Sequence, residues 1–386
     1  MQHKNTLMHE ILKPMPWGRF DRLVAHHGAD KSVRTLSTKG QLLALLQAQL
    51  SGAVSLREIE ATMASHGNRL YHLGATAPKR STLADANRSR PAEVFVALFQ
   101  TLLAQAHPGL RRATREAVRL IDSTTLPLNG LSSTWASYQT DIHGAKMHLV
   151  YDPDAEAPVH FAVTPQRIND ITAAQAMPIE PGATYVFDLG CYDYSWWANL
   201  LAHGCRFVTR LKKNTPTRLV EDRTVTDDAK MFGRIISDWI VLLPERLKGS
   251  RHHPLTQQLR EIEVVIDTGK VLRIVSSDLI PAPETIADLY KQRWQIELFF
   301  RWAKQTLKIR KFLGASQNAV RIQLAVALIA YLLLKLAHAS QRLIASPLTF
   351  AHLVRANLMQ FRAIGELLEP PKQLPQEPSS QLGFAI

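Results

Sequence analysis

Hydrophobic and polar positions repeat at helical spacing between residues 289 and 307. The hydrophobic positions follow steps of seven, four, three and four, which return to one face of a helix. They are Leu289, Ile296, Phe300, Ala303 and Leu307. The polar side of the same predicted helix carries Tyr290, Arg293, Glu297 and Lys304. A carboxylate therefore lies between two cations and a phenol on one stripe, although a solvated face with salt bridges has the same pattern.

Residues 1 to about 112 have the pattern of an all-helical domain. Helical stretches are expected at 41–49 and 91–105, and Ser55 with Glu58 has the form of a capping box. A further helix, N-capped by Ser81, carries a polar and basic cluster. The cluster consists of Lys79, Arg80, Asn87, Arg88 and Arg90. These side chains predict a helix that enters a major groove of DNA, but a helical bundle with a basic rim has the same pattern.

From Ala117 the pattern changes to short β-rich runs. The predicted strands are 117–121, 146–151, 158–164, 184–187 and 206–211, with helical stretches at 170–177 and 194–203. This order predicts an α/β fold in which a mixed sheet is flanked by helices. Further strand-like runs at 234–243, 261–266 and 271–275 predict a β-rich insertion within residues 212–280.

The remaining chain closes with helical stretches at 321–338 and 347–363 and a tail from Pro370 that we expect to be mobile. We therefore expect three parts. They are a helical DNA-binding domain over 1–112, an α/β domain over 113–345 that contains the insertion, and a C-terminal helix and tail over 346–386.

Charge is unevenly distributed along the 386 residues. The formal net charge is +13, and residues 1–120 alone carry +9 from seventeen basic and eight acidic side chains. A polyanion such as DNA or RNA is the natural partner of the positive electrostatic field around residues 1–120. Binding to a ribosome or a membrane surface uses the same charge.

Cysteine usage and hydropathy predict a soluble cytoplasmic protein. The two cysteines cannot form a disulfide framework, and no signal-peptide core opens the chain. The longest apolar run, residues 324–334, is too short to span a bilayer and predicts a buried helix. The cysteines and histidines lack the paired spacing of a zinc site.

Two aspartates follow predicted strands and change the interpretation of Glu297. Asp122 comes directly after the run that ends at Ile121, and Asp188 directly after the run that ends at Phe187. Ligands gather where the strands of an open α/β sheet end, so these aspartates and Glu297 could form one cluster. An aspartate in such a place is also a common turn or helix cap.

Three clustered carboxylates repel one another unless a cation shares them. Their hard oxygens suit Mg²⁺ or Mn²⁺, and two such ions can promote in-line attack on a phosphodiester. On the same helical stripe, Arg293, Arg301 and Lys304 would hold the substrate phosphates.

The segment from Tyr290 to Lys304 resembles the Y-x2-R-x3-E-x6-K signature of bacterial insertion-sequence transposases of the IS-four type. The residues from Ile121 to Thr124 resemble the first aspartate motif of that family, and those from Asp188 to Asp193 resemble the second. These motifs stand in the family's order, and the resemblance extends over roughly residues 115–345.

The resemblance implies a ribonuclease-H-like fold with a β-rich insertion, in which Asp122, Asp188 and Glu297 bind two divalent ions. It implies contacts to transposon-end DNA from Tyr290, Arg293 and Lys304, whereas the DNA role of Arg301 comes only from the stripe. In the insertion, Trp239 stands where the family places an aromatic residue that receives a flipped base, although a tryptophan buried on a strand has the same pattern.

The function that this resemblance implies is DNA transposition by metal-dependent cleavage and strand transfer. The expected partners are transposon ends and target DNA, bound by a homodimer in the synaptic complex, with no membrane partner and a location on the bacterial nucleoid. Two alternatives stay open: a DNA-binding protein derived from a transposase that no longer cuts, and a structure-specific nuclease or resolvase of the same fold.

Overall fold

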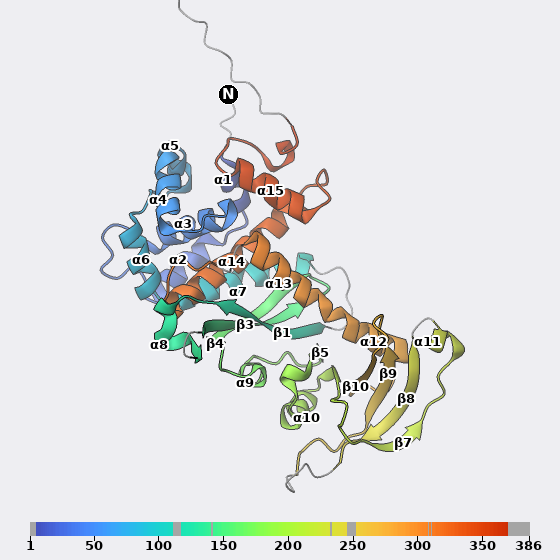
Figure 1. Ribbon diagram of the computed structural model, residues 1–386. Coiled ribbons are helices and arrows are strands. Elements are labelled where there is room, and N and C mark those ends of the chain that lie inside the picture. Colours follow the sequence, from blue (N-terminus) through green and yellow to red (C-terminus); the bar gives the residue numbers. More distant parts are fainter. Residues whose placement is uncertain are drawn as a thin grey trace, which may run out of the picture.

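The computed structural model describes residues 5–110, 117–139, 142–231, 234–244, 252–307, 309 and 311–369 (Figure 1). The tail from Pro370, for which the sequence predicts mobility, lies outside these residues. The predicted domain boundary at 112–113 lies outside them as well.

All regular elements that the structure describes within residues 5–110 are helices. They are α1 (Leu7–Leu12), α2 (Trp17–His26), α3 (Thr38–Ser51), α4 (Leu56–Ser65), α5 (Gly67–Leu70), η1 (Tyr71–Leu73), α6 (Arg80–Ser89) and α7 (Ala92–Leu110). Ser55 caps α4 as predicted, because its Oγ accepts from the backbone N of Glu58 at 3.1 Å. The prediction that Ser81 caps the next helix is wrong: α6 begins at Arg80, and Lys79 is its N-cap residue.

The strands of the described residues form one ten-stranded sheet in which β4 (Ala157–Pro165) pairs with β3 (Ile142–Asp152). The remaining order begins β2 (Ser137–Gln139), β3, β1 (Val118–Pro127), β5 (Thr184–Val186) and β6 (Arg206–Arg210). It continues through β10 (Val271–Ser276), β9 (Leu259–Val265), β8 (Ile235–Leu242) and β7 (Arg218–Asp222). β1 is antiparallel to β3 and parallel to β5, β5 is parallel to β6, and β10 is antiparallel to β6. The predicted β-rich insertion therefore extends the main sheet.

Helices cover both faces of this mixed sheet (Figure 1). One face packs against α9 (Asp170–Gln175) and α10 (Tyr194–Ala202), and the other against α12 (Pro283–Gln292), α13 (Trp294–Thr306) and α14 (Gln317–Ala339). Alternating strand residues serve the two faces: Leu120 belongs to the core beneath α13, whereas Ile121 belongs to the core beneath α10. Short elements complete the fold: η2 (Gly130–Ser132), α8 (Ser133–Ala136), η3 (Leu189–Cys191), α11 (Asp227–Met231), α15 (Pro347–Asn357) and η4 (Ile364–Glu366).

The single helix predicted for residues 289–307 is divided. α12 ends at Gln292 and α13 begins at Trp294, so that Arg293 lies at the junction of the two. The hydrophobic face is nevertheless as predicted, because Ile296, Phe300 and Ala303 are buried.

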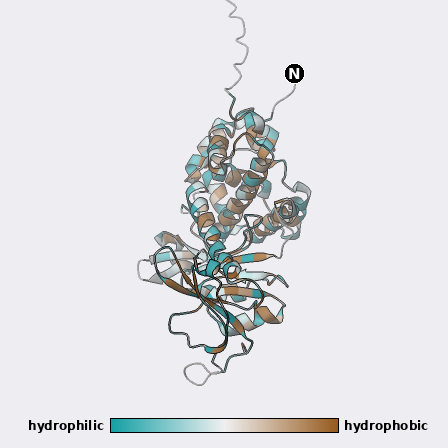
Figure 2. Cartoon of the chain, turned by 90° about the vertical axis from the view of Figure 1, so that its right-hand side faces the viewer, coloured by the Kyte–Doolittle hydropathy of each residue, from teal (hydrophilic) through white to brown (hydrophobic). Residues whose placement is uncertain are grey.

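α14 is a core helix shared by the two ends of the chain. Its 23 residues are long and apolar enough to cross a membrane, but most of the helix is buried inside the protein. α14 packs against α7 and α3. The residues after α15 contact α1, where the backbone N of Leu7 donates a hydrogen bond to the Gln360 carbonyl at 2.9 Å. In the side view, helices gather at one end and strands at the other (Figure 2). Contacts of α14 and α15 with α3 therefore cross the predicted boundaries at 112 and 345, which stay predictions.

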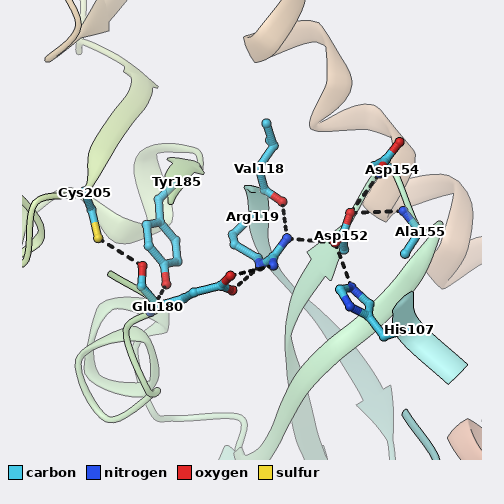
Figure 3. Close-up of polar contacts among 9 residues, drawn as sticks. All are labelled: His107, Val118, Arg119, Asp152, Asp154, Ala155, Glu180, Tyr185 and Cys205. Atoms are coloured by element: carbon cyan, nitrogen blue, oxygen red, sulfur yellow. Dashed lines mark hydrogen bonds and ion pairs between the residues drawn. The ribbon is translucent and has the colours of Figure 1, made fainter. Parts of the chain in front are cut away.

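A buried ion network holds the start of β1 (Figure 3). Arg119 donates to Asp152 at the end of β3 at 2.8 Å and to Glu180 in the loop before β5 at 2.7 Å. His107 of α7 shares the Asp152 carboxylate at 2.8 Å. Because Arg119 and Asp152 are both buried, these partners compensate for the loss of hydration. The network ties β1 to α7 on one side and to the β5 edge on the other.

Candidate active site

The register of β1 against β5 brings the two predicted aspartates together. Leu120 lies opposite Val186 in this parallel pair, and Asp122 and Asp188 each stand two residues further on. Because side chains alternate along a strand, Asp122 lies on the face that α13 covers. Asp188 stands beyond the end of β5, close enough for its charge to act on Asp122. One detail of the prediction is wrong: β1 continues to Pro127, so Asp122 lies within the strand, just beyond the end of its pairing with β5.

α13 brings Glu297 to the same face, and Arg293 joins it to Asp122. The guanidinium of Arg293 lies 3.0 Å from Asp122 Oδ2 and 2.6 Å from Glu297 Oε1. The Asp122 side chain is 18% exposed and that of Glu297 is 31% exposed. A single cation thus bridges two carboxylates, one from a strand and one from a helix, and its contact to Asp122 spans 171 residues of the chain.

The environment of Asp122 disfavours its charge. Burial raises the pKa of this carboxyl to about 6, and the nearby Asp188 and Glu297 charges add to the effect. The backbone N–H of Ser123 and the Arg293 guanidinium act in the opposite direction. A carboxyl with a pKa raised in this way is typical of a functional site.

Asp188 and Asp193 also serve as helix caps. Asp188 Oδ1 accepts from the backbone N of Gly190 at 2.7 Å, and Asp193 Oδ1 accepts from the backbone N of Trp196 at 2.7 Å. Asp193 thereby caps α10, which fits a supporting role.

The donor set fits a hard divalent ion by its chemistry. Within the described ranges, no three His, Cys, Asp or Glu side chains are grouped as they would be around a metal ion. The guanidinium of Arg293 instead stands between Asp122 and Glu297. A cation already occupies this place, so a metal ion bound by these carboxylates would displace or re-orient Arg293.

The remaining residues of the stripe lie around this centre. Lys304 donates through Nζ to Thr124 Oγ1, two residues beyond Asp122 on the same face of β1. Tyr290 is buried at the end of α12, and burial raises the pKa of its phenol, although the Arg210 and Arg293 charges oppose the shift. Arg301 is exposed, one helical turn after Glu297.

Sequence reasoning missed two residues beside this centre. Arg210 ends β6 near Tyr290, and its buried Nε has no hydrogen-bond partner among the described residues. Trp294 is 55% exposed, and its ring centre lies 5.9 Å from the guanidinium carbon of Arg293. Two features of the sequence indicate these residues. Arg210 stands at the end of a predicted strand, and Trp294 stands outside the hydrophobic stripe of its helix.

The structure corrects part of the predicted groove-reading helix. Asn87 and Arg90 are only 4% and 6% exposed. Both bind the Gln41 side chain of α3, Asn87 at 2.8 Å and Arg90 at 3.2 Å. The prediction that these two side chains contact DNA is therefore wrong, because they join α6 to α3.

The other three residues of that cluster are exposed: Lys79, Arg80 and Arg88. Arg88 forms an ion pair with Asp85 one turn earlier, at 2.6 Å. These three cations remain available to a polyanion.

Trp239 lies in the middle of β8. It is half-buried, stands opposite Asp222 of β7 and Glu261 of β9, and packs at the edge of the core beneath α10. The buried part of the ring agrees with a core role, and the exposed part leaves base capture as a prediction.

Comparison with known proteins gives the family. A family model described as a transposase DDE domain matches residues 113–333, and a second, described as a domain of unknown function, matches residues 3–76. The chain is 40% identical over 294 residues to “Putative transposase y4zB” of Sinorhizobium fredii, covering 76% of this chain and 81% of that protein. It is 28% identical over 263 residues to “Probable transposase for insertion sequence element IS5377” of Geobacillus stearothermophilus, covering 66% of each.

A solved structure, the piggyBac transposase synaptic complex with hairpin DNA, aligns with 95% of this chain and 81% of its own, at 10% identity and a TM-score of 0.44. So distant a likeness leads to no further conclusion about this chain. The transposase DDE domain model, in contrast, covers more than half of the 386 residues. The chain therefore belongs to the family of transposase DDE domains and is a DNA transposase.

Proposed function

We propose that this transposase binds the terminal inverted repeats of an insertion sequence of the IS-four type, cuts at the ends and joins them to target DNA. The observation that carries the proposal is the pairing of Asp122 and Glu297 with one guanidinium, that of Arg293, while the charge of Asp188 lies close enough to act on Asp122. The intact carboxylate set favours a cutting enzyme over a DNA-binding derivative.

Strand order supports a ribonuclease-H-like core. The five strands β4, β3, β1, β5 and β6 are adjacent in that order, with antiparallel pairs at the first two steps and parallel pairs at the last two. The first aspartate lies on the central strand of these five. The insertion then adds β10 to β7 beyond β6.

Enzymes of this family use divalent metal ions. Two ions, Mg²⁺ or Mn²⁺, held by Asp122, Asp188 and Glu297 would activate a water or 3′-hydroxyl and stabilise the leaving oxygen. The protein supplies the carboxylates on rigid elements and holds them near one another before binding, with Arg293 compensating their charge. Release of Arg293 from the carboxylates frees a guanidinium fork that can bind a phosphate through two hydrogen bonds.

Contacts to DNA follow from the cations around the centre. Tyr290, Arg293 and Lys304 would contact the transposon end, and Arg301 and Arg210 would add charge to the phosphate path. In the helical part, Lys79, Arg80 and Arg88 would bind the DNA backbone outside the cleavage site.

Synapsis of two ends implies a homodimer on the DNA. Cleavage at both ends must be coordinated before joining, and each subunit contributes one carboxylate centre. The expected location is the bacterial cytoplasm, on the nucleoid when DNA is bound.

Charge-removing substitutions test the catalytic assignment. Asp122→Asn, Asp188→Asn and Glu297→Gln should each abolish Mg²⁺-dependent cleavage of end DNA while binding in EDTA is retained, because members of one ion site act as a unit. Glu284→Gln in the first turn of α12 is the matched control and should cut normally.

The same assay separates the alternatives. Substantial cleavage by any of the three variants would refute the carboxylate assignment. A wild-type chain that binds ends but never nicks them would be a DNA-binding derivative, and cleavage without strand transfer would indicate a nuclease or resolvase.

A further inference from the structure

Asp170 lies beside the aspartate centre on the face of the sheet opposite α13. It opens α9, and its Oδ1 accepts from Ser123 Oγ at 2.8 Å and from Lys146 Nζ at 3.1 Å. The ring Nδ1 of His148 is 3.6 Å from the same oxygen. In the register of β1 and β3, Ser123 stands opposite His148 and Thr125 opposite Lys146, so all these side chains point to α9.

Ser123 connects Asp170 with Asp122. Its backbone N donates to Asp122 Oδ1 at 2.7 Å, while its hydroxyl is held by Asp170 on the other face of the strand. The Asp122 carboxylate is thus bound by the backbone of Ser123 through one oxygen and by Arg293 through the other, and the Ser123 side chain is bound by Asp170.

Asp170 also approaches Asp188. A Cβ placed on Gly190 would lie 3.0 Å from Asp170 Oδ2 and 3.0 Å from Asp188 Oδ1. Two carboxylates therefore converge on a residue without a side chain, and the Gly190 backbone N donates to Asp188 at 2.7 Å. Asp122, Asp170 and Asp188 line one small cavity.

The partners of Asp170 balance its charge within the fold. Lys146 places a cation on its Oδ1, and His148 is buried with Nε2 hydrogen-bonded to Thr164 at 2.8 Å. Burial lowers the pKa of His148 to about 4, so this ring is neutral at physiological pH. Asp170 therefore contacts one cation, Lys146, and two neutral groups, the Ser123 hydroxyl and the His148 ring. Lys146 balances the charge of the Asp170 carboxylate without a metal ion.

We propose that Asp170 is a positioning residue for the catalytic carboxylates. Through Ser123 it fixes the Asp122 carboxylate in the orientation that binds the metal ion, and through its position beside Gly190 it limits the movement of Asp188. Partners of metal ligands tune affinity in this way without touching the ion. The inference rests on the proposed function, because it assumes that Asp122 and Asp188 bind a metal.

Metal binding by the full-length chain without DNA tests this role. Free Mn²⁺ is followed by electron paramagnetic resonance during titration of the wild type, Asp170→Asn, Ser123→Ala and the double variant. Each single variant should bind Mn²⁺ about tenfold more weakly, and the double variant no more weakly than either single one, because both break one connection. Ser123→Thr keeps the hydroxyl and should restore the wild-type affinity.

Asp227→Asn is the matched control, because it removes an exposed carboxylate at the start of α11 and should leave Mn²⁺ affinity unchanged. Wild-type affinity in both Asp170→Asn and Ser123→Ala would overturn the inference, as would additive losses in the double variant. If Asp170→Asn does not fold, Ser123→Ala alone decides. A wild type that binds Mn²⁺ and cuts, with unaffected variants, overturns only this inference, whereas a wild type that does neither refutes the proposed function.

Discussion

The carboxylate of Asp122 is held where a charge is costly. Its folded-state pKa of about 6 lies above the ordinary value of 3.8, a difference that corresponds to roughly 3 kcal/mol. In the folded chain Asp122 keeps its proton up to about pH 6, whereas the unfolded chain loses it near pH 4. Between these values the folded state binds more protons, so the free energy of unfolding falls as the pH rises.

We expect Asp122→Asn to stabilise the metal-free protein at pH 7. The wild type loses roughly 3 kcal/mol between pH 4 and pH 7 from this one group, and the amide does not. Urea unfolding in EDTA at pH 4, 5.5 and 7 measures the difference, which should be small at pH 4 and largest at pH 7. A difference that does not change with pH would contradict burial of the Asp122 charge as its cause.

At this scale the sequence singled out three carboxylates, whose role as metal ligands stays a prediction, and the structure corrected two of the polar residues that were expected to contact DNA. Asp122, Asp188 and Glu297 follow from motif and spacing, since strand register and helix periodicity place them. Asn87 and Arg90 could not be assigned in this way, because their burial depends on Gln41, 46 and 49 residues away. Local spacing shows which residues share a face and does not show whether a distant helix covers it.

Among the elements, β1 and the insertion show where tertiary pairing overrides local preference. β1 extends through Asp122, Ser123 and two threonines because each residue from Leu120 to Pro127 pairs with β3. The sequence predicted β8, β9 and β10 from their strand-like runs of residues. It missed β7, whose five residues are all exposed and carry no such pattern.

Trp239 belongs to this insertion, and its substitution separates packing from base capture. We expect Trp239→Ala to lower the free energy of unfolding by about 2 kcal/mol, because only part of the ring is buried. At temperatures where the variant remains folded, nicking should be normal and nicked ends should accumulate, because a flipped base loses its stacking partner.

Circular dichroism measures the temperature range in which the variant is folded. Separate assays of first-strand and second-strand cleavage show whether only the second step is lost. Trp239→Phe retains an aromatic ring and serves as the control. Loss of both cleavage steps together with loss of the fold would mean that Trp239 has only a core role.

Over the whole molecule, the two ends of the chain build one helical part. Asn318 at the start of α14 donates from its side chain to the carbonyls of Asn87 at 3.1 Å and Arg90 at 2.6 Å, which close the end of α6. Neither contact is visible in a sequence pattern, since the partners stand 231 and 228 residues apart. α13, which carries Glu297, is followed along the chain by α14 of this helical part.

A fragment of residues 1–112 should therefore not fold by itself. It lacks α14, which buries the facing sides of α3 and α7, and it lacks the Asn318 contacts to α6. Circular dichroism and a thermal melt of the purified fragment should show no cooperative transition, whereas the full-length chain should show one. A cooperative melt of the fragment would restore the boundary at residue 112 as a domain limit.

DNA binding by the helical part is consequently best tested in the full-length chain. Alanine replacement of Lys79, Arg80 and Arg88 together should weaken binding to end DNA and make its salt dependence shallower, because each lost phosphate contact removes about 0.9 from the slope of log affinity against log salt. Replacement of Lys13, Lys270 and Arg342, which are also exposed, lowers the net charge equally and is the control. An equal change of slope in both variants would show that the protein's overall field attracts DNA; a change confined to the first would place a DNA-binding surface at α6.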